Sequence, residues 1–245
     1  MNNDTPKFSV ISICLNEELN IQRTCESVCS QNHNDFEWIV IDGGSTDRTL
    51  HILEKYSDKI TTLVTEPDSG IYNAMNKGIS MASGEYVVFL NAGDQFFHRN
   101  TLNIIAAAPQ MDILYGDLII TRADGVELLE TFPDRLTPYY LLWGWLPHPA
   151  TFIKMRLFKE FGVYDESFRI AGDYDLFLRL LYKKETTYHH VKETLAKFFN
   201  GGISTNPLHR KRLNKEQHLI RKKHSLSYRF SLKGLRREIR AWFLR

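Results

Sequence analysis

The sequence predicts an α/β protein with a mostly parallel sheet and helices against its faces. Strand-like apolar runs alternate with helical patterns through the first third of the chain, which is typical of parallel sheets. Acidic residues also stand where apolar runs end, with Asp42 after Trp38–Ile41 and Asp94 after Glu85–Leu90. Ligands bind beyond the carboxyl ends of parallel strands, so these acids indicate a site at that edge.

The front half is predicted from its periodicity. Helices are expected to begin where Asn20, and then Ser45 or Thr46, can cap them. Gly84 separates a third helix from the strand that leads to Asp94. The expected strands are Phe8–Leu15, Glu37–Asp42, Ile60–Thr65 and Glu85–Leu90, and the expected helices are Glu18–Gln31, Arg48–Tyr56 and Ile71–Met81.

The second half is less regular, and we expect its strands to be antiparallel. A turn at Ala123-Asp124-Gly125 divides two apolar runs, which predicts a hairpin. The segment 133–149 is rich in proline and aromatic residues, which favours a loop or short helices lining a surface. The expected elements are a helix near Thr101–Ala108, strands Ile113–Ile120 and Glu127–Phe132, and a helix over Tyr174–Tyr182.

Length and composition favour one large domain with an appendage. A chain of 245 residues with 43% hydrophobic residues can bury a sizeable core. We predict the domain over 1–205, with halves 1–98 and 99–205, and a basic helical tail over 206–245. No apolar run approaches the roughly 18 residues of a membrane-spanning helix, and the acidic N-terminus lacks a secretory pattern. We therefore expect a cytoplasmic protein.

The tail from Asn206 onward carries the chain's charge asymmetry. It holds 13 Lys and Arg and two acidic residues (13 − 2 = +11), whereas the other 18 basic and 27 acidic residues give 18 − 27 = −9. Such polarity predicts an anionic partner for the tail. Leu232, Leu235, Ile239 and Trp242 recur at helical spacing, which favours an interfacial helix on anionic lipid over a solvated helical hairpin.

Two polar runs in the front half are candidates for ligand contacts. The run Asp42–Asp47 is a strand end and a tight glycine turn into a helix, which suits a nucleotide or phosphate. A plain turn with an aspartate cap is the alternative. The run Asp68–Gly78 opens a helix whose polar face carries Asn73, Asn76 and Lys77. Lys77 suits a phosphate as a point charge, and a solvated lysine is the alternative.

Asp173 and His148 are the candidates for chemistry in the second half. A carboxylate can accept the proton of an attacking hydroxyl, which makes Asp173 a candidate general base. Its alternative role is to cap the helix that follows. His148 stands between two prolines close to Trp145, which favours a role at the site over that of an ordinary loop histidine.

Four runs make the chain resemble the inverting glycosyltransferases of family 2. The resemblance covers nearly the full length and is greatest with small bacterial enzymes of exopolysaccharide, colanic acid and O-antigen assembly. Glu66–Gly78 is the most specific run and resembles the family's donor-side helix. The other runs are Ile39–Asp47 for the first acidic motif, Leu90–Asp94 for the DXD position and Ala171–Leu176 for the acidic catalytic motif.

The resemblance implies the GT-A fold, a Rossmann-like sheet with an antiparallel acceptor-side half. The half 1–98 would bind the nucleotide sugar, and the half 99–205 would hold the acceptor and the base, Asp173. Asp94 would bind a Mn²⁺ or Mg²⁺ ion, and Trp145 and His148 would border the leaving group or the acceptor. The implied donor-binding residues are Asn16, Glu17, Asp42, Asp68, Lys77, Asn91 and Asp94, with Asp42 at the nucleobase.

The sequence departs from the family's pattern at two places. Asn91 and Gly93 stand where acids are usual in the metal motif, which leaves Asp94 as the sole carboxylate ligand there. One carboxylate with substrate phosphates and waters is adequate for Mg²⁺ or Mn²⁺, and weak affinity for free metal is expected. Gly172 replaces a glutamate that often precedes the base, and the base itself is retained.

The prediction is therefore inverting, metal-dependent transfer of a sugar, with UDP-sugars favoured, to a hydroxyl of a saccharide acceptor. A polyprenyl-diphosphate-linked acceptor at the inner face of the cell membrane, in bacterial surface polysaccharide synthesis, would suit the basic tail. A non-catalytic nucleotide-sugar-binding protein is the main alternative because the metal motif is degenerate. A nucleotidyltransferase would need a glycine-rich triphosphate loop, which Cys14–Glu17 does not supply. Nucleic-acid binding rests on charge alone, and no nucleic-acid partner is predicted.

Overall fold

The computed structural model describes residues 5–122, 124–181, 185–202 and 207–224. Within these ranges one nine-stranded sheet runs in the order β3-β2-β1-β4-β8-β6-β9-β5, with β7 beside β6. The strands are β1 (Phe8–Cys14), β2 (Phe36–Asp42), β3 (Thr62–Thr65), β4 (Tyr86–Phe89), β5 (Gln95–Phe96), β6 (Ile113–Arg122), β7 (Glu127–Glu130), β8 (Thr151–Lys154) and β9 (Tyr188–Asn200). The α-helices are α1 (Ile21–Cys29), α2 (Thr49–Glu54), α3 (Ile71–Met81), α4 (Thr101–Ala107), α5 (Pro138–Trp143), α6 (Met155–Phe161), α7 (Gly172–Leu181) and α8 (Arg210–Lys223), and short 3-10 turns lie at His148–Ala150 and Pro207–His209.

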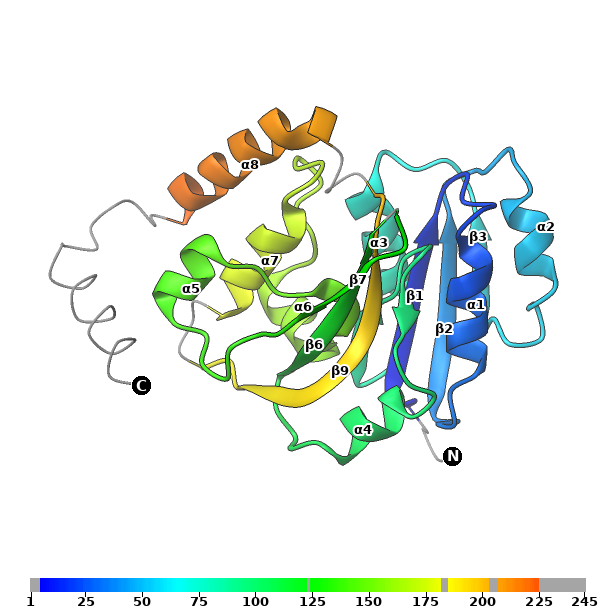
Figure 1. Ribbon diagram of the computed structural model, residues 1–245, viewed down its shortest axis with the longest axis horizontal. Helices are drawn as coiled ribbons and strands as arrows, with labels where there is room; N and C mark the ends of the chain where they lie inside the picture. The colour runs from blue at the N-terminus through cyan, green and yellow to red at the C-terminus, as the bar shows by residue number, and fades with distance from the viewer. Residues whose placement is uncertain (1–4, 123, 182–184, 203–206, 225–245) are drawn as a thin grey trace, which may run out of the picture.

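The front half forms the predicted parallel sheet. β1 pairs in parallel with β2 and β4, and β2 pairs in parallel with β3. Every residue of β1 and β4 is buried, as expected for strands that are covered on both faces. Figure 1 shows α1 and α2 beside these strands at one end of the molecule, away from α5, α7 and α8. The α/β class is therefore confirmed.

The predicted helix caps are wrong at both starts. Asn20 flanks α1 but its side chain does not cap it, because the Nδ2 group donates to Glu17 at 2.8 Å. α2 begins only at Thr49, and Ser45 and Thr46 do not cap it. Both residues instead hydrogen-bond to residues at the ends of β1 and β2. The loops at this edge of the sheet are consequently longer than the sequence predicted.

The second half is mixed where we expected it to be antiparallel. The predicted hairpin is present, since β7 pairs antiparallel with β6, and β8 pairs antiparallel with both β4 and β6. β6 and β9, however, run parallel from Ile113–Tyr188 to Arg122–Asn200. The chain between them passes through a long crossover that includes α5, α6 and α7, and such a crossover permits parallel pairing.

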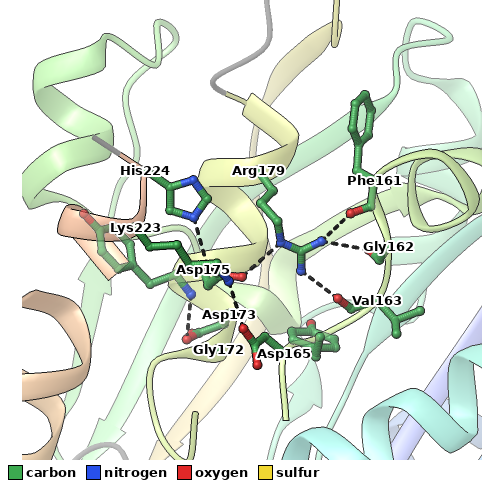
Figure 2. A network of polar contacts seen from close by, with 12 residues as sticks. Phe161, Gly162, Val163, Asp165, Gly172, Asp173, Asp175, Arg179, Lys223 and His224 are labelled. Carbon is green, nitrogen blue, oxygen red and sulfur yellow. Dashed lines mark hydrogen bonds and ion pairs between the residues drawn. The ribbon is translucent and has the colours of Figure 1, made fainter. Parts of the chain in front are cut away.

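The described part of the predicted tail is attached to the domain. α8 lies against α7 in Figure 1, and its Ile220 is fully buried. Figure 2 shows the buried carboxylate of Asp175 on α7 bound by Arg179 at 2.9 Å, Lys223 at 3.1 Å and His224 at 2.9 Å. The apolar positions from Leu232 to Trp242 lie outside the described residues, and a boundary at 206 remains a prediction.

Candidate active site

The turn after β2 is held by two of the predicted donor residues. The Oδ2 atom of the buried Asp42 accepts from the N–H groups of Gly44 at 3.1 Å and Ser45 at 2.9 Å, and its Oδ1 accepts the Ser45 hydroxyl. Asn16 follows β1 with a left-handed φ of 54°. It donates its N–H to Ser45 Oγ at 2.8 Å and accepts the Thr46 N–H at 2.9 Å. Asp42 and Asn16 thus shape the loop between β2 and α2 at the carboxyl edge of the sheet.

Asp68 is brought directly against this turn. Its Oδ1 accepts the N–H of Gly70 at 2.8 Å, and a Cβ atom added to Gly43 would lie 2.4 Å from its Oδ2. Only glycine at position 43 permits this approach. The two polar runs of the front half therefore meet at one place.

The polar face of α3 points at the protein and not at open space. Lys77 Nζ lies 2.7 Å from Glu66 Oε1 and 3.1 Å from the carbonyl oxygen of Pro67, so it braces the segment that leads to Asp68. Asn73 and Asn76 both donate to Glu166, at 3.1 Å and 2.8 Å. The side chains of these asparagines therefore bind the segment that precedes α7, and contact with a ligand stays a prediction.

The DXD position forms a second group of polar atoms after β4. Asp94 is 4% exposed, and its Oδ1 accepts the N–H of Phe199 at 3.2 Å. His148 Nε2 lies 3.8 Å from the other carboxylate oxygen and 3.1 Å from Asn91 Nδ2. The buried Oδ1 of Asn91 has no hydrogen-bond partner within the described part of the chain.

Burial sets the charges of this group. Burial, with a smaller contribution from the nearby charge of Glu17, raises the pKa of Asp94 to about 8, although the N–H groups that it accepts from oppose this shift. Burial lowers the pKa of His148 to about 4, so the ring is neutral at neutral pH and its Nε2 can accept from Asn91. Glu17 itself is held through its N–H, which donates to Thr49 at 2.8 Å.

These atoms fit a hard divalent cation. A carboxylate and an unpartnered amide oxygen are the ligand types that Mg²⁺ and Mn²⁺ prefer, with phosphates and waters in the other positions. Among the described residues there is no cluster of three or more acidic, His or Cys side chains with metal-binding geometry. Asp94 and Asn91 are thus the pair that would hold such an ion together with a substrate.

Asp173 lies in the first turn of α7 and is partly buried. Its Oδ1 accepts the N–H of Tyr174 at 2.9 Å and lies 3.5 Å from the hydroxyl of Tyr72. Its Oδ2 makes no hydrogen bond to any residue that the structure describes. Burial raises the pKa of Asp173 to about 6, although the backbone N–H groups at the helix start oppose this shift. One oxygen therefore secures the helix start, and the other has a lone pair that no described residue occupies and that can accept a proton.

Two residues that sequence reasoning missed hold the backbone around Asp173. The Tyr72 hydroxyl on α3 accepts the N–H of Gly172 at 2.7 Å and donates to the carbonyl of Ile170 at 2.7 Å. Glu216 on α8 accepts the N–H groups of the three residues before Gly172. Tyr72 lies inside the run Glu66–Gly78. In the sequence it looks like an ordinary core tyrosine, and only its hydrogen bonds to Gly172 and Ile170 distinguish it.

Trp145 and His148 lie at different parts of the site. Trp145 is 43% exposed, packs edge-on against Phe132 at 5.2 Å, and lines a pocket that also contains Asp173. His148 lies at Asp94, as described above. The remaining lining of the pocket at Asp173 is mostly apolar or aromatic and consists of Tyr140, Leu141, Gly144, Leu146, Tyr174, Phe177 and Leu178.

Comparison with known proteins agrees with this arrangement. Residues 9–151, more than half of the chain, match the family model described as glycosyl transferase family 2. The chain belongs to glycosyl transferase family 2. This family 2 chain is 32% identical over 209 residues to the PGL/p-HBAD biosynthesis glycosyltransferase of Mycobacterium bovis, covering 81% of this chain and 79% of that one.

Solved structures show the same fold. The 1–349 fragment of Staphylococcus aureus TarS in complex with UDP-GlcNAc matches with a TM-score of 0.71 and 22% identity, covering 87% of this chain and 65% of that one. The mannosyltransferase PcManGT of Pyrobaculum calidifontis, in complex with GDP-Man and Mn²⁺, matches with a TM-score of 0.63 and 20% identity, covering 87% and 62%. The family 2 chain thus spans slightly less than two thirds of either structure, and both likenesses confirm the GT-A fold.

Replacement of Tyr72 by Phe tests the anchoring of the helix start. We expect a loss of about 1–3 kcal/mol in the free energy of unfolding, because a buried N–H and a buried C=O lose their partner. Urea unfolding followed by circular dichroism measures this change. Tyr164→Phe is the matched control, since the Tyr164 ring stacks on Tyr72 at 5.2 Å and its hydroxyl has no hydrogen bond to the described residues. An equal loss in both variants would contradict the assignment.

Proposed function

We propose that this chain transfers a sugar from a nucleoside diphosphate sugar to a hydroxyl group of a saccharide acceptor, with inversion at the anomeric carbon. The observation that carries this proposal is Asp173, which lines a pocket and whose pKa of about 6 suits a base near neutral pH. Membership of family 2 supports the class of reaction.

The donor would lie across the carboxyl ends of β1, β2 and β4. We assign the nucleobase to the loop that Asn16 and Asp42 shape, with Asp68 beside it, and the diphosphate to Asn91 and Asp94. Glu17 would contact the donor near Asp94. Lys77 would contribute to donor binding indirectly, because it holds the segment 66–68 in place. A UDP-sugar is favoured, in line with the TarS complex, and a GDP-sugar is the alternative in line with PcManGT.

Asp94 and the Asn91 amide oxygen would hold Mn²⁺ or Mg²⁺ together with the diphosphate. When bound, the ion supplies positive charge that stabilises the departing diphosphate. The neutral His148 fixes the amide of Asn91 so that its Oδ1 is free for this purpose.

Residues of the chain itself would accept the proton and orient the acceptor sugar. Asp173 accepts the hydroxyl proton of the acceptor as that oxygen forms its bond to the anomeric carbon. The bond from that carbon to the diphosphate oxygen breaks on the opposite face, and the diphosphate leaves with the electron pair. Trp145 and Tyr140 present aromatic rings on which an acceptor sugar can stack beside Asp173.

A nucleotide-sugar-binding protein without transfer activity is the rival that the degenerate metal motif suggests. It requires the donor site but gives no role to Asp173. The open carboxylate oxygen and the raised pKa of Asp173 are costly features for a binding protein, and they favour the transferase.

Donor binding is the first test of the proposal. We expect one class among UDP-, GDP- and dTDP-sugars to raise the melting temperature when Mn²⁺ is present, and Asp94→Ala to lose this rise because the ion loses its carboxylate. Differential scanning fluorimetry measures it, with Asp58→Ala as a control on an exposed carboxylate that precedes β3 and pairs with its neighbour Lys59. A rise that is independent of metal, or retained in Asp94→Ala, would contradict the assignment.

Asp173→Asn separates the transferase from the rival. We expect transfer to fall at least ~10²-fold while donor-induced stabilisation persists, because the amide cannot accept the proton. In the unsubstituted protein, kcat/KM should rise with pH through about 6 and then level off, since the carboxylate must be deprotonated to act. Nucleotide release at several pH values measures both. Transfer that persists undiminished in Asp173→Asn excludes this residue as the base.

We further propose that the tail docks on an anionic membrane surface and brings the site to a polyprenyl-diphosphate-linked acceptor at the inner face of the cell membrane, in surface polysaccharide synthesis. The charge of the tail supports this proposal, together with the exposed basic residues of α8. Among the described helices, none has the length and hydropathy to cross a bilayer. The exposed basic residues of α8 include Arg210, Lys211, Lys215 and Lys222.

The tail should bind vesicles through its charge. We expect the full chain to co-sediment with vesicles of phosphatidylglycerol and phosphatidylcholine and not with vesicles of pure phosphatidylcholine. The bound protein should dissociate as the salt concentration rises. Changing Lys233, Arg236, Arg237 and Arg240 to Gln should weaken binding by more than about tenfold. The matched control changes four exposed basic residues elsewhere to Gln, namely Lys55, Lys59, Arg122 and Lys159. Equal weakening in both variants would show that net charge alone is responsible.

A further inference from the structure

A buried carboxylate on α8 lies at the start of the helix that carries Asp173. Glu216 is 6% exposed, and its oxygens accept the N–H groups of Arg169 at 3.1 Å, Ile170 at 2.9 Å and Ala171 at 3.0 Å. Arg212, one turn earlier on α8, donates its Nε–H to the same group at 3.0 Å. Although burial opposes ionisation, these donors hold the pKa of Glu216 below its usual range.

The next three backbone N–H groups along the chain donate to other side chains. The N–H groups of Gly172 and Asp173 point at the Tyr72 hydroxyl, at 2.7 Å and 3.4 Å, and that of Tyr174 points at Asp173 Oδ1. Six consecutive backbone donors, from 169 to 174, are therefore directed at three side chains. Because N–H groups before and within a first helical turn lack helical partners, such contacts determine the path of the backbone there.

The position of Glu216 is itself fixed by the packing of α8. Ile220, one turn further along, is fully buried in the core. At the end of α8, Lys223 bridges Asp165 at 2.8 Å and Asp175 at 3.1 Å, and His224 also contacts Asp175 (Figure 2). Burial raises the pKa of Asp175, but the bonds from His224, Lys223 and Arg179 outweigh it and bring the pKa to about 2. The end of α8 is thereby attached to Asp175 on α7 and to Asp165 before it.

We propose that Glu216 is a positioning residue for the transfer reaction. By holding the N–H groups of residues 169–171, it directs the backbone so that the open oxygen of Asp173 faces the acceptor pocket. The C-terminal helix α8 is then part of the apparatus that orients the base. This inference rests on the proposed function of Asp173 as the base.

The test is a double-mutant cycle between Glu216 and Asp173. Glu216→Gln keeps the size of the side chain but places an NH₂ group opposite backbone N–H donors. We expect kcat to fall at least ~10-fold, with donor affinity within about twofold of the original. In an Asp173→Asn background the same change should cost less than about twofold, because a residue that acts only through Asp173 has no further effect once that carboxylate is lost.

Temperature and controls separate positioning from general destabilisation. All variants are assayed well below their melting temperatures, and Asn214→Ala, an exposed change on the same helix, should retain the original kcat. If Glu216→Gln does not fold, Glu216→Asp keeps the charge on a shorter side chain and undergoes the same cycle with the same expected pattern.

The outcomes are distinct. A Glu216→Gln kcat equal to that of the original protein, or an equal fold-loss with and without Asp173, overturns the positioning role while leaving the proposed function intact. Absence of transfer by the original protein with every donor class overturns the proposed function, and the positioning role with it.

Discussion

The structure depends on how six consecutive backbone N–H groups, from residue 169 to residue 174, find partners at the start of α7. Helix starts always leave unpaired donors, and here they are in a buried region where water cannot serve all of them. Tyr72 comes from the donor-side helix, Glu216 from the C-terminal helix and Asp173 from α7 itself. One local requirement thus joins the two halves of the domain to α8 at the place where the proposed base lies.

Burial shifts the pKa values of three titratable groups at the site in the direction that favours their neutral forms. Burial raises the pKa of Asp94 to about 8 and of Asp173 to about 6, and it lowers the pKa of His148 to about 4. In the absence of substrate the region around Asp94 therefore carries little charge near neutral pH. A cation and a diphosphate that enter together bring compensating charges, which agrees with weak affinity for free metal and stronger affinity for metal with donor.

Sequence reasoning recovered the features that local patterns encode. Apolar runs such as Phe8–Leu15 mark the buried parallel strands, and the acids that follow them lie at the carboxyl edge of the sheet, as Asp42 and Asp94 do. Asp68 and Asp173 stand in short runs of contiguous residues that the sequence displays directly. These inferences succeed because strand burial and strand-end loops are properties of contiguous residues.

The remaining features depend on contacts between distant parts of the chain. Tyr72 meets Ile170 across 98 positions, and Glu216 meets Ala171 across 45, so neither partnership has a local signature. The same is true of the parallel pairing of β6 with β9, which depends on a crossover of more than sixty residues. The contacts of Asn73 and Asn76 with Glu166 likewise join residues about 90 positions apart, and the sequence gives no sign of them.

The anomeric configuration of the first-formed product tests the central claim most directly. Proton NMR of the product formed with the nucleotide sugar that binds gives this configuration, because the glycosidic linkage does not change its configuration once it has formed. We expect a single displacement assisted by Asp173, so an α-linked donor should give a β-linked product. A product that retains the α configuration would contradict the role of Asp173 as the base of an inverting transferase.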